Sequence, residues 1–173
     1  AEARLAAQAP APDAATALLP RLFGGVPGAP AVAVTLRDGS GAPASRFASG
    51  DRVTVDLTID AGDRERFVAA FALDGRGEVV NLTRFMQLEP ADREGAPDAV
   101  GAGVSTLIFD QLECVERGSG LIAAFVGGRS VGALVAAPLI QSEQAFGRAV
   151  STLLQSGEGP ATAIATHALH CDA

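Results

Sequence analysis

The chain has 173 residues, a formal net charge of −7 and no lysine. Its hydrophobic fraction of 48% excludes a disordered chain, and its length fits one hydrophobic core. The arginines are scattered and form no basic stripe, which argues against nucleic acid as a partner, and the absence of Trp and Tyr removes the usual platforms for stacking on sugars or bases.

The amino-terminal segment differs in composition from the rest. Five prolines in residues 1–30 prevent a long helix, so we interpret this segment as an Ala/Pro-rich linker or arm. Residues 31–173 are assigned to a single β-sandwich-like domain. The first residues show neither an initiating Met nor a signal-peptide pattern, which indicates a processed or excised chain.

Alternating side chains predict the first strands. Residues 31–36 alternate larger apolar side chains with smaller or polar ones, and residues 52–60 place Val, Leu and Ile at odd positions and polar side chains at even positions. One apolar and one polar face is typical of an antiparallel sheet that packs on a core. Residues 67–73 are apolar on both faces, which predicts a central strand.

A hairpin is expected at Asp74-Gly75-Arg76-Gly77, where two glycines can supply positive φ before a strand over residues 78–85. This turn lacks the ligand series of an EF-hand, so it is not expected to bind a cation. The sequon Asn81-Leu82-Thr83 falls inside the predicted strand, and we interpret it as accidental.

The second half of the chain begins with a predicted surface loop over residues 86–103. Strands are expected over 104–109, 112–115, 121–126, 131–136 and 161–171, and a helix over 141–155 with Ser142 as its N-cap. The expected fold is therefore mainly β, an antiparallel β-sandwich of about eight strands with one late amphipathic helix. The apolar stretch 121–140 is interrupted by Gly127-Gly128-Arg129-Ser130, so no membrane span is expected.

The two cysteines, Cys114 and Cys171, fit either one disulfide in an exported protein or two buried thiols in a cytosolic one. A disulfide between them would contribute about 4 kcal/mol in the chain-entropy model. The segment around Cys114 faintly resembles a caspase nucleophile segment, in which a Gln stands two residues before the Cys and a Gly two residues after it, but here both are displaced. Glu113 and Glu116 would also raise the pKa of the Cys114 thiol and disfavour a thiolate. We therefore expect structural cysteines.

Potential zinc ligands gather in the tail, where His167, His170 and Cys171 are close in sequence. In a strand the two histidines point to opposite faces, and His167 lies about 13 Å from Cys171, so the three could share a metal only if the tail were helical.

No P-loop, GxSxG, HExxH or dinucleotide fingerprint is present. We expect no metal, no cofactor and no catalytic residues.

Two segments resemble the bacterial domain-of-unknown-function family 4384. They are Phe47-Ala48-Ser49-Gly50-Asp51-Arg52-Val53-Thr54-Val55, and Phe67 to Val79 with its Asp-x-x-Gly turn. The resemblance implies a β domain without established catalytic residues, often located beside a caspase-like peptidase domain or in an envelope protein. This chain lacks the Tyr and Trp that are frequent in that family.

The expected function is a non-catalytic accessory or protein-interaction domain of an exported or envelope-associated bacterial protein. The expected partner is another protein or an adjoining peptidase-like domain, with sheet edges and residues 86–103 as contact surfaces. A cytoplasmic location stays open. The alternatives are a cysteine-dependent hydrolase that uses Cys114 or Cys171 with a tail histidine, and a structural component of an envelope or assembly.

Overall fold

The structure is a computed structural model that describes residues 29–74, 77–89, 95–114, 118–136, 142–157 and 161–172. The predicted linker or arm, residues 1–30, lies outside the described residues except for its last two positions.

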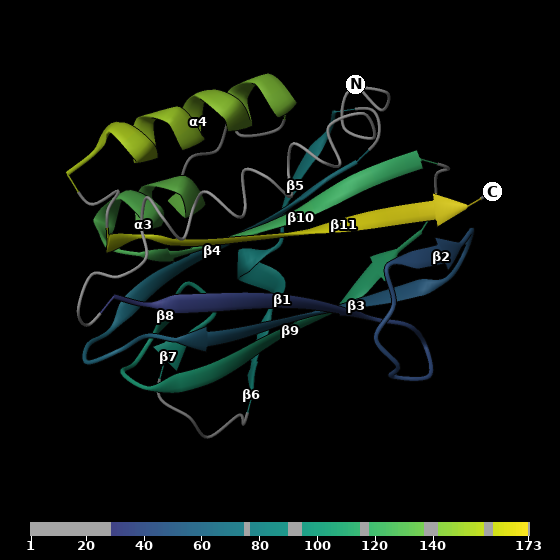
Figure 1. The fold of residues 1–173 in the computed structure, drawn as a ribbon, viewed down its shortest axis with the longest axis horizontal. Helices are drawn as coiled ribbons and strands as arrows, with labels where there is room; N and C mark the ends of the chain where they lie inside the picture. Colours follow the sequence, from purple (N-terminus) through teal and green to yellow (C-terminus); the bar gives the residue numbers. More distant parts are fainter. Residues whose placement is uncertain are drawn as a thin grey trace.

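Two mostly antiparallel sheets and two late α-helices make up the described part of the chain (Figure 1). The elements in chain order are β1 (Ala31–Arg37), β2 (Arg46–Ala48), β3 (Arg52–Asp60), β4 (Arg66–Leu73), β5 (Val79–Asn81), the 3₁₀ turn η1 (Thr83–Phe85), β6 (Gln87–Glu89), β7 (Gly95–Ala96), β8 (Ala99–Val100), β9 (Val104–Glu113), β10 (Gly118–Gly127), α3 (Arg129–Ala136), α4 (Glu143–Gln155) and β11 (Ala163–Asp172).

The first sheet has the strand order β1-β3-β9-β6, and the second has the order β2-β11-β10-β4-β8-β7, with β5 also paired to β4. The short strand β2 runs parallel to the carboxyl end of β11, and the other described pairs are antiparallel. The mainly β prediction is therefore confirmed.

The two sheets share one hydrophobic core. Leu57 and Ile59 from β3, Leu107 from β9, and Ile122 and Val126 from β10 are fully buried in it. Because alternate residues of a strand point to opposite faces, the intervening residues of β10 point to the other side of the second sheet. The sandwich therefore leaves a second apolar face, which needs its own cover.

The helices α3 and α4 supply that cover and form a third layer (Figure 1). Phe71 from β4, Phe125 from β10 and Phe146 from α4 meet there, with ring centroids 5.3 to 6.2 Å apart in tilted or edge-to-face arrangements. The helices cover only part of this face, and the carboxyl end of β11 lies beyond them, beside β2 (Figure 1).

Several predicted elements are confirmed. The odd residues of β3 are buried and its even residues are exposed or half-buried, as the alternation indicates. The hairpin joins β4 to β5, and Gly77 has a φ of 84°, which glycine adopts without strain. Helix α4 begins after Ser142, whose Oγ accepts a hydrogen bond from the Ala145 backbone N–H at 3.1 Å.

The strand predicted over residues 131–136 is wrong, because these residues belong to α3. Their buried side chains are Val131, Leu134 and Val135, and a spacing of three and four places them on one face of a helix. The Gly128 carbonyl accepts the Val131 N–H at 3.0 Å and starts the first turn. The domain therefore has two late helices where one was expected.

Three boundaries also differ from the predictions. The second arm of the hairpin ends at Asn81, and η1 follows it. The predicted loop over residues 86–103 contains the short strands β6, β7 and β8. The strands predicted over 104–109 and 112–115 are one strand, β9, whose alternation is interrupted by a register shift opposite Val53 and Val55. Such a shift places an extra residue in one strand, so the alternation of buried and exposed side chains is out of phase on its two sides. The sequence pattern therefore indicates two strands where the structure has one.

Candidate functional site

A disulfide joins Cys114 to Cys171 and connects the two sheets. Cys114 directly follows β9 of the first sheet, Cys171 lies in β11 of the second, and their Cα atoms are 5.7 Å apart. Both side chains are buried in the shared core. Of the two alternatives that the sequence leaves open, the structure has the disulfide.

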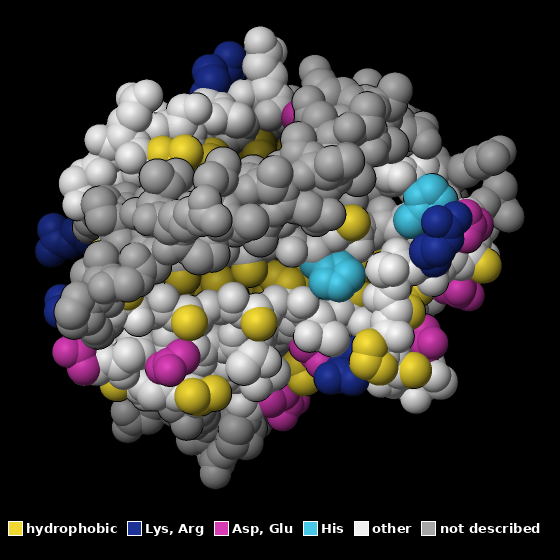
Figure 2. Space-filling model, viewed as in Figure 1, with side chains coloured by type: hydrophobic (Ala, Val, Ile, Leu, Met, Phe, Trp, Pro, Cys, Tyr) yellow, Lys and Arg dark blue, Asp and Glu magenta, His cyan; other side chains and the backbone are white. Residues whose placement is uncertain are grey.

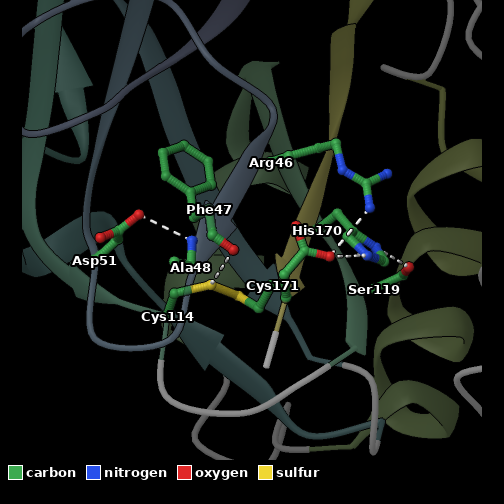
Figure 3. Close-up of a disulfide and its surroundings, with 9 residues drawn as sticks. Arg46, Phe47, Ala48, Asp51, Cys114, Ser119, His170 and Cys171 are labelled. Carbon is green, nitrogen blue, oxygen red and sulfur yellow. Dashed lines mark hydrogen bonds and ion pairs between the residues drawn. A yellow bond between two sulfur atoms is a disulfide. The ribbon is translucent and has the colours of Figure 1, made fainter.

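The turn after β2 holds Cys114 in place for this bond. The Cys114 N–H donates to the Asp51 carbonyl at 2.9 Å, and the Cys114 carbonyl accepts the Gly50 N–H at 2.7 Å. Asp51 also caps β2, because its carboxylate accepts the Ala48 N–H at 2.8 Å (Figure 3). The disulfide, β2 and the end of β11 therefore form one connected corner of the domain.

A row of polar side chains crosses this corner on the opposite side of β11 from the disulfide (Figure 3). His170 Nδ1 lies 2.9 Å from Ser119 Oγ on β10, and His170 Nε2 lies 3.0 Å from Asp172 Oδ1. Arg46 Nη2 on β2 donates to the same Asp172 oxygen at 3.0 Å. We call Ser119, His170, Asp172 and Arg46 the polar row.

Strand register explains why these side chains meet. Ser119 lies opposite His170 in the antiparallel pair of β10 and β11, and Arg46 lies opposite His170 in the parallel pair of β2 and β11. The His170 backbone N–H donates to the Ser45 carbonyl, so it points toward β2 and away from β10. Ser119 and His170 thus form a non-hydrogen-bonded pair, the type in which opposite side chains are closest.

The polar row is accessible to solvent. The side chains of Arg46, Asp172 and His170 are 67%, 49% and 35% exposed, and Ser119 is half-buried. On the face drawn in Figure 2, a histidine meets basic and acidic side chains at the end of the molecule where β2 and the carboxyl end of β11 lie.

The hydrogen bonds define the proton positions when His170 is neutral. An ionised carboxylate only accepts hydrogen bonds, so the contact with Asp172 requires the proton on His170 Nε2. His170 Nδ1 then carries a lone pair and accepts the Ser119 hydroxyl proton. The Ser119 hydroxyl therefore donates to the His170 imidazole, which in turn donates to the Asp172 carboxylate, and Arg46 holds that carboxylate in place.

The other predicted site residues do not join this row. His167 lies on the opposite face of β11 from His170, as the alternation predicts, and its Nδ1 contacts the adjacent Ala168 carbonyl at 2.8 Å. Cys171 is adjacent to His170 in sequence but points into the core toward Cys114. Within the described ranges, no group of three or more His, Cys, Asp or Glu side chains could hold a metal ion.

The polar row is absent from the sequence-based predictions, although part of its signal was available. A closing strand places His170 and Asp172, two residues apart, on one face. Ser119 falls between the strands predicted over residues 112–115 and 121–126, and only the pairing of β10 with β11 brings it opposite His170. The polar row therefore depends on the register in which β10 and β2 pair with β11.

Comparison with known proteins gives no family model that matches this chain, and no curated protein matches it significantly. The resemblance to family 4384 stays a prediction. Neither α3 nor α4 is long and apolar enough to span a membrane, and the other described residues add no such helix.

Proposed function

We propose that this chain is an accessory, protein-interaction domain of an exported or envelope-associated bacterial protein, and that it does not carry that protein's catalytic centre. The observation that carries the proposal is the disulfide between Cys114 and Cys171, the two cysteines of the sequence. Structural disulfides persist in oxidising compartments, which supports export.

The same bond argues against a cysteine hydrolase. A catalytic cysteine acts as a thiolate, and neither sulfur is a free thiol when the two are bonded to each other. Both side chains are also buried, which separates them from a substrate in solvent.

The proposed contact surface lies around residues 86–103. Two large apolar side chains flank this segment, Phe85 at 66% exposure and Val104 at 56% exposure. Single exposed apolar residues are common, but aromatic side chains contribute more than their share of binding energy when a partner buries them. The partner is expected to be a second protein or an adjoining peptidase-like domain.

The compartment is tested by mass spectrometry of protein isolated from the native bacterium under non-reducing conditions, with thiols blocked at lysis. We expect the oxidised mass and a peptide that links Cys114 to Cys171. Two alkylated cysteines in the native protein would contradict export and would restore the cysteine hydrolase as a candidate.

The contact surface is tested with a photo-crosslinking amino acid placed at Phe85 or Val104 in the full-length gene product. Ser151, exposed on α4, provides a matched control position on the helix layer. We expect crosslinks to the partner or adjoining domain from Phe85 and Val104 but not from Ser151. Crosslinks from Ser151 alone would place the contact on the helices and refute this surface.

A further inference from the structure

We propose that the Ser119 hydroxyl is a nucleophile that His170 activates and that accepts an acyl group from small activated esters. The inference goes beyond the accessory role, because it concerns a single acyl transfer to one side chain, which is not the parent protein's catalytic centre and needs no protein partner. It rests on the continuous contacts from Ser119 Oγ to His170 Nδ1 at 2.9 Å and from His170 Nε2 to Asp172 Oδ1 at 3.0 Å.

Both contacts of His170 have the arrangement of donor and acceptor that activation of the Ser119 hydroxyl requires. A general base must lie within hydrogen-bond reach of the proton it removes, and His170 Nδ1 meets this condition. The Asp172 carboxylate holds the Nε2 proton, selects the tautomer with a free Nδ1 lone pair, and stabilises the imidazolium that forms. Asp172 and Arg46 are positioning residues, since neither contacts the hydroxyl.

Stability alone does not account for the polar row. The pair of Arg46 and Asp172 is 67% and 49% exposed, and ion pairs at such exposure contribute about 0 to 1 kcal/mol. The disulfide already fixes the carboxyl end of β11 against the first sheet. His170, 35% exposed, remains open to an incoming molecule.

The neighbouring residues indicate the class of substrate. Leu121 and Ala168 lie opposite each other one step along the same face, next to Ser119 and His170. Leu121 packs against the apolar cluster under α4. A short apolar acyl chain fits this surface better than a charged one, so we assign esters of small uncharged carboxylic acids.

The reaction balances without a cofactor. Ser119 Oγ bonds to the ester carbonyl carbon while its proton moves to His170 Nδ1. The bond from that carbon to the alcohol oxygen then breaks, and the His170 proton passes to the departing oxygen. The products are an acyl ester of Ser119 and a free alcohol.

The test uses the oxidised 173-residue chain with p-nitrophenyl acetate, followed by intact mass and peptide mapping. The sequence has no lysine, so no lysine amine competes for the acetyl group. We expect one acetyl group on Ser119, no labelling at that position in Ser119→Ala, and at least about 100-fold slower acetylation of Ser119 in His170→Gln, the usual contribution of a general base. His167→Ala is the matched histidine control and should react like the wild type.

Asp172→Asn distinguishes positioning from a structural role. We expect slower acetylation and an altered rate–pH profile, with an unchanged urea unfolding midpoint for the oxidised protein. Labelling of Ser119 at the wild-type rate in His170→Gln would overturn the proposal. An acetyl group that maps only to His167 or to the amino terminus would also overturn it.

Discussion

Cys114 and Cys171 are 57 residues apart in sequence, yet their disulfide joins the end of β9 in one sheet to β11 in the other. The loop that it closes contains β10, both helices and most of β11. The bond therefore restricts the unfolded chain over the segment that also carries Ser119 and His170.

Replacing both cysteines, as Cys114→Ala with Cys171→Ala, should lower the free energy of unfolding by about 4 kcal/mol, since a loop of 57 residues costs roughly that in closure entropy. Urea denaturation measures the loss. Reduced wild type should lose a similar amount, and reductant should leave the double variant unchanged. Equal urea midpoints for oxidised wild type and the double variant would contradict this prediction.

Gly120 is predicted to be required by the close approach of β10 to β4. A Cβ at this position would overlap with the Leu73 carbonyl oxygen, so the backbone must shift. We expect Gly120→Ala to cost about 1 to 3 kcal/mol, the usual penalty of overpacking. Thermal unfolding measures it.

The matched control is Gly147→Ala in α4, where a Cβ would meet nothing within 4 Å. Removing a glycine from a helix interior should stabilise the domain by about 0.5 to 1 kcal/mol. A loss of stability in Gly147→Ala would contradict the open space at that position. Unchanged stability in Gly120→Ala would contradict the close approach of β10 to β4.

Asp38 provides a pH-dependent prediction. The Ser40 hydroxyl and the Ser40 backbone N–H donate to its carboxylate, at 2.6 and 2.9 Å, and lower its pKa from the ordinary value of 3.8. A lowered pKa in the folded state means that this contribution to stability is complete above the unfolded pKa and is lost as the pH falls through the folded pKa.

An NMR titration of the Asp38 side chain should therefore give a pKa below 3.8 in the wild type. Ser40→Ala removes the largest cause and should raise that pKa toward the ordinary value, while the backbone donors keep part of the shift. No difference between the two proteins would contradict the assigned cause.

The strands with one polar and one apolar face were predictable because burial on one side imposes a period of two. Residues 52–60 carry this pattern without interruption, and β3 has those bounds. Residues 131–136 were misassigned because a short apolar run fits either a strand or a buried helix. The pairing of Ser119 with His170 was not predictable, since register depends on distant strands.

Thr83 carries the last prediction. Its side chain is fully buried, and its Oγ1 accepts the Ala70 backbone N–H at 2.8 Å beyond the end of the pairing between β4 and β5. Thr83→Val keeps the shape but leaves this N–H without its acceptor, so we expect a loss of about 1 to 3 kcal/mol. Thr83→Ser keeps the hydroxyl and loses one methyl group, which should cost about 1 kcal/mol. Urea denaturation measures both variants.

Hydrogen exchange separates the two effects on Thr83. The Ala70 amide should exchange faster in Thr83→Val than in Thr83→Ser by more than their difference in global stability explains, because only valine removes the acceptor. Equal protection of Ala70 in both variants would mean that the hydroxyl is not its acceptor. The same hydrogen bond gives the threonine of the sequon a structural role, so a folded domain should present no accessible hydroxyl there for recognition of Asn81-Leu82-Thr83.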